Sequence, residues 1–248
     1  ESAGWVAEFI TRDLHRSKYV TGNVMTEYEE RFVKKGNPIF MMKIRPPKTD
    51  RREVAGPDKL CAIDLDGTLM RSDSIVSEYS KEVLRRAIRS GIEFLPTSGR
   101  SFRAAIDAVS DIEGTRYLLG GNASVITEIA TEDIIRQWTI PRDISYRIYR
   151  TVRDNGGYIE MYCENDVYTE RGTEQIAYRS LLNPTFINSL LNTVIRVPSM
   201  DLMLRRGIME VNKIHIIFPK QKDLRKYASI FAEYPEVNVV FPTQYNME

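Results

Sequence analysis

LCAIDLDGT, residues 60–68, is the stretch that decides the fold expected for this chain of 248 residues. An apolar run typical of a buried β-strand ends in two aspartates, one residue apart, before a glycine turn. Because side chains two positions apart in a strand point the same way, Asp64 and Asp66 should face the crevice beyond its carboxyl end. Such a pair can bind a divalent cation and divide phosphoryl transfer between a nucleophile and a proton shuttle. The alternative is a strand end with two solvated aspartates.

A second segment, IEFLPTSGR at residues 92–100, is expected to form the next strand, and it ends in residues that include the hydroxyl side chains of Thr97 and Ser98. Between the two segments the pattern predicts a helix, with Ser77 as its N-cap and Gly91 as its C-terminal stop. Its apolar face is formed by Tyr79, Val83, Leu84, Ala87 and Ile88. A strand, a helix and a strand at this spacing predict a right-handed crossover between parallel, adjacent strands. The Ser98 hydroxyl would then arrive beside Asp64.

These two segments resemble motifs one and two of the haloacid dehalogenase (HAD) superfamily of Mg²⁺-dependent phosphohydrolases, in particular its Cof-type sugar-phosphate phosphatases. The resemblance covers residues 58–248 and implies an α/β fold, a Rossmann-like core with an incomplete parallel sheet and an inserted α/β cap domain. It implies that Asp64 is the nucleophile and becomes an aspartyl phosphate, and that Asp66 is the general acid/base. Mg²⁺ would be held by Asp64 and Asp66, the latter through its backbone carbonyl. The substrate would be a small phosphorylated metabolite.

The resemblance also implies a phosphate site. Ser98 would be the phosphate-binding hydroxyl, with Thr97 as a weaker claimant to that role. Further substrate- or phosphate-binding candidates are Gly99, Arg100, Asn122 and Lys213. Asn122 lies in a turn where Cof-type relatives usually carry Asn-Gly-Ala, whereas here Ala123 follows it.

Two motifs of that family do not appear in the sequence: the third-motif lysine and an acidic cluster of the GDxxND kind. Lys213 is a candidate substitute for the lysine, but it lies in a cap-type strand, where a structural or cap role is the other interpretation. A metal held by one carboxylate and one carbonyl would bind weakly, because hard cations take several oxygen ligands. We therefore expect an incomplete catalyst, with an exposed apolar edge on a truncated sheet.

The remaining pattern is α/β. It predicts helices over 102–109, from Pro141 at the first helical position to 154, and over 220–233. It predicts strands over 117–119, 158–163, 167–169, 211–218 and 237–242, and a turn over 120–124. The expected domains are the HAD core over 59–140, the cap over 141–240, and the start of the return to the core over 241–248.

Residues 1–45 resemble the C-terminal end of bacterial tRNA (guanine-N7-)-methyltransferases. The likeness rests on the segments TEYEERF at residues 26–32 and GNPIF at residues 36–40. It implies that Thr26, Tyr28 and Glu29 help to line a pocket for S-adenosylmethionine and guanine, and that tRNA is a partner of this segment. The glycine-rich cofactor loop of such an enzyme is absent from this sequence. Residues 46–58, rich in proline and charge, are expected to be a solvated linker, or one whose basic residues contact tRNA.

The composition is that of a folded protein, with 42% hydrophobic and 28% charged residues. The formal net charge of +1 gives no general reason to expect nucleic-acid binding. No apolar run has the length of a membrane span and no signal peptide is recognisable, so we expect a cytoplasmic protein without a membrane partner. Cys61 and Cys163, each in a buried-looking strand, indicate neither a disulfide framework nor a metal site. His15 and His215 are interpreted as structural.

Three functions stay open at this point. The chain could be part of a HAD-type phosphatase, part of a tRNA methyltransferase fused to a HAD domain, or a HAD-fold binding protein without catalysis. The coding sequence on each side would separate them. A downstream lysine and GDxxND cluster favour the first, and an upstream glycine-rich cofactor strand favours the second, whereas a natural stop after Glu248 favours the third. Sequence indicates neither the phosphate ester nor the oligomeric state.

Overall fold

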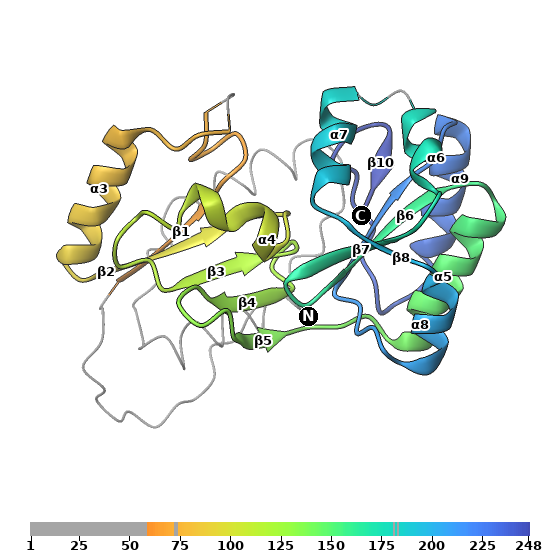
Figure 1. Cartoon of the computed structure of the whole chain (residues 1–248), viewed down its shortest axis with the longest axis horizontal. Helices are drawn as coiled ribbons and strands as arrows, with labels where there is room; N and C mark the ends of the chain where they lie inside the picture. Colours follow the sequence, from red (N-terminus) through yellow and green to blue (C-terminus); the bar gives the residue numbers. More distant parts are fainter. Residues whose placement is uncertain (1–58, 72–73, 181, 183) are drawn as a thin grey trace. The chain divides into compact units, whose positions relative to one another are not determined.

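The computed structural model describes residues 59–71, 74–180, 182 and 184–248 (Figure 1). The methyltransferase-like candidates Thr26, Tyr28 and Glu29, together with His15 and the linker 46–58, lie outside the described residues. The described chain divides into two compact units. Of the described residues, those up to Thr97 and those from Ala108 to Tyr117 belong to the first unit, and those from Ser98 to Asp107 and from Leu118 to Glu248 belong to the second. Within the described ranges, no helix combines the length and the apolar content needed to cross a membrane.

The first unit contains the predicted strand, helix and strand. β1 (Lys59–Asp64) and β2 (Ile92–Thr97) are parallel neighbours, with Lys59 opposite Ile92 and Asp64 opposite Thr97. They are joined through α3 (Glu78–Arg89), whose first turn is capped because Ser77 Oγ accepts a hydrogen bond from the Ser80 N–H at 3.1 Å. The parallel pairing and the N-cap are confirmed.

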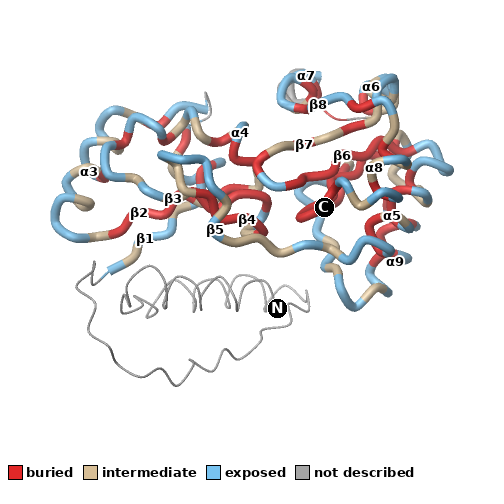
Figure 2. Tube along the Cα trace, turned by 60° about the horizontal axis from the view of Figure 1, so that its bottom comes forward, coloured by how far each residue is buried: buried red, intermediate tan, exposed pale blue. Residues whose placement is uncertain are grey.

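The burial expected for three residues of this unit is wrong. Tyr79 and Val83, placed on the apolar face of the helix, are 79% and 37% exposed, and Leu84 is the residue of α3 that is buried. Cys61, expected in a buried strand, is exposed. β1 has exposed or half-buried positions throughout, whereas four of the six residues of β2 are buried (Figure 2). The difference follows from strand order, because β1 is the terminal strand of the described sheet β1-β2-β3-β4-β5.

The other strands of that sheet are β3 (Tyr117–Gly120), β4 (Val125–Glu128) and β5 (Ile134–Gln137), the last two forming an antiparallel pair. The helix expected over 102–109 is shorter: α4 (Phe102–Ala105) continues as a 3₁₀ turn, Ile106–Ala108. In the turn after β3, Gly121, Asn122 and Ala123 all have positive φ, at 59°, 57° and 67°. This left-handed turn lies beside the candidate site.

The second sheet has the order β10-β9-β6-β7-β8. Its strands are β6 (Tyr158–Cys163), β7 (Asp166–Glu170), β8 (Ile195–Val197), β9 (Lys213–Ile217) and β10 (Asn246–Met247). β6 is antiparallel to both β9 and β7, and β10 is antiparallel to β9. The strand expected over 237–242 is wrong. Val240 exchanges two backbone hydrogen bonds with Glu248, but the segment joins no sheet, and β10 takes the place beside β9.

Helices cover both faces of the second sheet. They are α5 (Arg142–Asp154), α6 (Glu174–Tyr178), α7 (Pro184–Asn192), α8 (Met200–Arg206) and α9 (Gln221–Phe231). Pro141, expected at the first helical position of α5, is instead its N-cap, one position earlier. Successive side chains of a strand point to opposite faces. Ile159 and Met161 of β6 therefore pack in the core that includes α5, α8 and α9, and Tyr158 and Tyr162 pack in the core that includes α6 and α7.

Candidate active site

The end of β1 and the loop after it present the two predicted aspartates, Asp64 and Asp66, to solvent. Leu65, between them, is fully buried, and its N–H donates to the Thr97 carbonyl at 3.0 Å. Because Leu65 anchors the chain, Asp64 and Asp66 on either side of it are exposed. Thr68 Oγ1 donates to Asp64 Oδ2 at 3.2 Å, and the Leu69 N–H donates to the Asp64 carbonyl at 3.1 Å. The loop thus leaves both carboxylates accessible to a solute.

Ser98 directly follows β2, near the end of the second predicted motif. It is buried, and its N–H donates to the Leu119 carbonyl at 2.9 Å. Its Oγ accepts a hydrogen bond from the Arg100 N–H at 3.1 Å. A hydroxyl that accepts in this way keeps its own proton for another acceptor. Ser98 can therefore serve as a hydrogen-bond donor to a phosphoryl oxygen.

Lys213 is brought to the Ser98–Arg100 segment, although it lies far along the chain. Its Nζ donates to the Gly99 carbonyl at 2.8 Å and to Glu248 Oε1 at 2.7 Å. The ammonium also lies 4.5 Å from the centroid of the Tyr162 ring. Burial lowers the pKa of Lys213 below its ordinary value, and the Glu248 carboxylate opposes that shift.

Asn122 joins the same cluster. Its Nδ2 donates to Glu248 Oε2 at 2.7 Å, so both oxygens of that carboxylate have a partner. A Cβ at position 99 would lie 2.7 Å from Asn122 Oδ1, so any larger residue there would displace the Asn122 side chain. Gly99, Asn122 and Lys213, predicted separately from the sequence, are therefore in contact, and sequence reasoning missed Glu248 and Tyr162.

The two halves of the predicted site lie in different units. Asp64, Asp66 and Thr97 belong to the first unit, and Ser98, Gly99, Arg100, Asn122 and Lys213 belong to the second. The convergence of Asp64 and Ser98 stays a prediction. Arg100 is half-buried, and its Nη1 donates to the Ala104 carbonyl at 3.5 Å. Ser101, the next residue, has a buried Oγ without a hydrogen-bond partner among the described residues.

A buried network of hydrogen-bonded polar side chains lies on the same face of the second sheet as Lys213. Tyr158 OH donates to Glu160 Oε1 at 2.7 Å, His215 Nδ1 is 3.0 Å from Glu160 Oε2, and Asn246 Nδ2 is 2.8 Å from His215 Nε2. Burial raises the pKa of Tyr158. The alternation Lys-Ile-His-Ile-Ile over residues 213–217 is the sequence signal that could have indicated this polar face.

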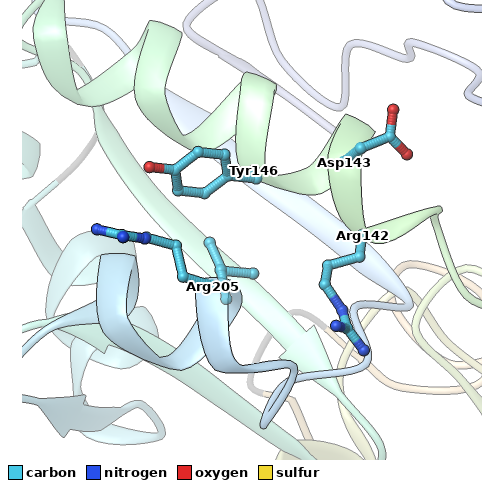
Figure 3. A pocket seen from close by; sticks show the side chains of 5 residues that line it. Arg142, Asp143, Tyr146 and Arg205 are labelled. Carbon is cyan, nitrogen blue, oxygen red and sulfur yellow. The ribbon is translucent and has the colours of Figure 1, made fainter.

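A separate open groove of about 460 Å³ lies between α5 and α8. It is lined by Arg142, Asp143, Tyr146, Leu204 and Arg205. The side chains of Arg142 and Arg205 point away from each other (Figure 3). They do not form a convergent anion site.

Oxygen donors for a cation come from the end of β1 and the loop after it. Among the described residues, no group of three or more histidine, cysteine, aspartate or glutamate side chains is placed to hold a metal. Asp64 and Asp66 supply the carboxylate oxygens that a hard cation prefers. They fit part of a Mg²⁺ shell, the rest of which would come from other oxygens such as water or phosphate.

Comparisons with known proteins divide the chain in two. Residues 61–248 match the model of the haloacid dehalogenase-like hydrolases. The phosphatase YwpJ of Bacillus subtilis is 28% identical over 118 residues, covering 48% of this chain and 41% of that protein. A haloacid dehalogenase-like hydrolase structure from Bacteroides thetaiotaomicron superposes with a TM-score of 0.61 at 20% identity, covering 76% of this chain and 69% of that one.

The N-terminal residues have a different likeness. They are 62% identical over 40 residues to the C-terminal end of the tRNA (guanine-N(7)-)-methyltransferase of Lachnoclostridium phytofermentans. The match covers 16% of this chain and 19% of that enzyme. The chain thus spans about a fifth of this relative and about two fifths of the phosphatase.

Proposed function

The chain belongs to the haloacid dehalogenase-like hydrolases, and from this membership we propose that it forms part of a phosphatase for small phosphorylated metabolites. The observation that carries the proposal is the exposure of Asp64, at the end of β1, together with Asp66 in the loop that follows. β1 is paired with β2, the strand that leads into Ser98. The likeness to the phosphatase YwpJ favours the same chemistry.

In the proposed reaction, Asp64 Oδ attacks phosphorus as the ester P–O bond breaks, which forms an aspartyl phosphate. Asp66, with its carboxyl protonated, gives its proton to the leaving alkoxide. It then takes a proton from the water that attacks the aspartyl phosphate, so that the P–Oδ bond breaks and phosphate leaves. The Ser98 hydroxyl donates to a phosphoryl oxygen throughout, with Thr97 as the alternative donor and Arg100 as a nearby positive charge.

We propose that the carboxylate of Asp64 and the backbone carbonyl of Asp66 would hold Mg²⁺. When bound, this ion supplies positive charge that offsets the repulsion between the Asp64 carboxylate and the phosphoryl oxygens. The exposure of both residues supports the proposal, since a cation and an anionic substrate must reach the same carboxylate.

The test is phosphate release from a panel of phosphomonoesters, with and without Mg²⁺, by the natural gene product that contains this chain. Asp64→Asn should abolish release and also the covalent phosphate on the protein, which mass spectrometry detects as an acid-stable, base-labile adduct. Asp107→Asn, at an exposed aspartate outside the site, is the matched control and should leave both unchanged. Turnover that survives Asp64→Asn, or no turnover of any ester by the unaltered protein, would contradict the proposal.

The N-terminal likeness favours a second function for the same gene product. The identity of 62% over 40 residues supports an origin in a tRNA (guanine-N7-)-methyltransferase, with Thr26, Tyr28 and Glu29 in its S-adenosylmethionine and guanine pocket and tRNA as its substrate. The test is methyl transfer from S-adenosylmethionine to tRNA by the natural gene product. Glu29→Gln should lower the rate, whereas its neighbour Glu30→Gln should not. If the unaltered protein transfers no methyl group, a working fusion is excluded.

A further inference from the structure

Three successive backbone carbonyls of the Ser98–Arg100 segment each accept a hydrogen bond. The Ser98 carbonyl accepts from the Asn122 N–H at 3.2 Å, and the Arg100 carbonyl accepts from the Gly121 N–H at 2.8 Å. The middle carbonyl, of Gly99, accepts from Lys213 Nζ at 2.8 Å. A carbonyl away from water needs a donor. Lys213 therefore completes a set whose other two members come from the turn after β3.

The surroundings of Lys213 suit a structural cation better than a substrate ligand. An ammonium has three N–H donors, and two of them are directed at the Gly99 carbonyl and at Glu248. The Tyr162 ring covers it at 4.5 Å, and the side chain is only 5% exposed. The charge of Lys213 is thus already compensated inside the protein.

Glu248 connects this lysine to the turn. Its two carboxylate oxygens take one bond from Lys213 Nζ and one from Asn122 Nδ2, both at 2.7 Å. Its backbone is fixed by two hydrogen bonds of 2.9 Å to Val240. A carboxylate held in this way restrains both Lys213 and Asn122, and through them both sides of Gly99.

We propose that Glu248 and Lys213 are positioning residues, which hold the Ser98–Arg100 segment in the conformation that presents the Ser98 hydroxyl to an oxyanion. The role as an aid to phosphate binding rests on the proposed phosphatase function, and the role in ordering the segment does not. Lys213 acts through the Gly99 carbonyl and does not itself contact the phosphate.

The alternative, in which Lys213 binds the phosphate directly, predicts the opposite change in phosphate affinity when Glu248 is neutralised. If Lys213 bound phosphate directly, the Glu248 carboxylate would compete with the anion for the ammonium, and its neutralisation would strengthen phosphate binding. If Glu248 positions Lys213, neutralisation loosens the segment and weakens binding. The sign of the change in phosphate affinity in Glu248→Gln therefore separates the two roles.

The experiment uses chain 1–248 with inorganic phosphate as the probe, by calorimetry, and amide hydrogen exchange by NMR. In Lys213→Met and in Glu248→Gln, exchange at the amides of Arg100, Gly121 and Asn122 should accelerate by about tenfold or more, while phosphate affinity falls. The amides of Ile159 and Ile216, in strands of the same unit, should keep their protection. Lys222→Met, at an exposed lysine of α9, is the matched control and should change neither measurement.

Lys213→Met leaves the Glu248 carboxylate without its cation, which destabilises the fold. The double variant Lys213→Met/Glu248→Met removes both charges and so avoids a buried, unpaired carboxylate. It should keep a cooperative fold and still show fast exchange at the three loop amides, whereas Lys213→Arg should restore part of the protection. Higher phosphate affinity in Glu248→Gln, or unchanged loop protection in the folded variants, would overturn the proposal. If the unaltered chain binds no phosphate, the proposed aid to phosphate binding is contradicted, while the exchange data still decide the role in ordering the segment.

Discussion

Replacement of His215 by leucine should destabilise the second unit severely, because His215 lies between two buried polar groups. Asn246 Oδ1 accepts from Thr243 Oγ1, so Asn246 Nδ2 faces His215 Nε2 and donates to it. Nδ1 must then carry the imidazole proton and donate to Glu160 Oε2. Leucine removes both bonds and leaves a carboxylate and an amide short of partners in a region where His215 is 1% and Glu160 0% exposed.

The two losses set the size of the effect. A hydrogen bond to a charged group contributes roughly 1.5–3 kcal/mol, and a buried amide donor left unsatisfied costs about 1–3 kcal/mol. We therefore expect the free energy of unfolding to fall by about 3–5 kcal/mol in total. At roughly 2–4 °C per kcal/mol for a domain of this size, Tm should fall by about 10 °C.

The assay is urea unfolding followed by circular dichroism, with thermal melting as a second probe. Glu160→Gln is the matched variant, because its amide oxygen can accept from His215 Nδ1 while its amide N–H donates to the Tyr158 oxygen, and it should lose only about 1 kcal/mol. The double variant Glu160→Leu/His215→Leu should be more stable than the sum of the two single changes predicts, since it buries no unpaired charge. A loss below about 1 kcal/mol in His215→Leu, or strict additivity in the double variant, would refute this account of the network.

Two further predictions test local features of the fold. Iodoacetamide at about pH 8 should label Cys61, which is exposed on β1, and should spare Cys163, because burial raises the pKa of the Cys163 thiol to about 12. Labelling is measured by mass spectrometry of the folded protein, and comparable labelling of the two cysteines would contradict the burial of Cys163. Ala123→Gly should raise the free energy of unfolding by about 0.5–1 kcal/mol, because Ala123 has a φ of 67° that glycine adopts without strain. Ala105→Gly, in α4, should destabilise by a similar amount, and a urea midpoint that falls in Ala123→Gly would count against the reasoning.

The parts of the fold that sequence predicts well are encoded locally. Ser77 caps α3, Gly91 follows the end of that helix with a φ of 88°, and the apolar run before Asp64 forms β1. Each signal lies within a few residues of the element that it controls, and a parallel β1–β2 pair follows from the length of the connection.

The parts that sequence cannot give depend on partners far along the chain. The segment 237–242 has high β-propensity, but Val240 is 48% and Phe241 51% exposed, because no sheet accepts them as a strand. The contact between Lys213 and Gly99 joins residues 114 positions apart, and nothing near Lys213 identifies that carbonyl as its partner. The residue types therefore indicated Gly99, Asn122 and Lys213 as candidates, but their contacts depend on the packing of β9 and β10, which the sequence does not reveal.

The two-faced burial of β6 limits how the length of this protein can change. All six residues from Tyr158 to Cys163 are buried, and alternate side chains serve different cores. Insertion or deletion of a single residue within β6 would exchange those faces and turn the carboxylate now at Glu160 toward Ile214 and Ile216. Natural length variation in this unit should therefore fall in turns such as that at Gly172, where an added Cβ would meet no other atom within 4 Å.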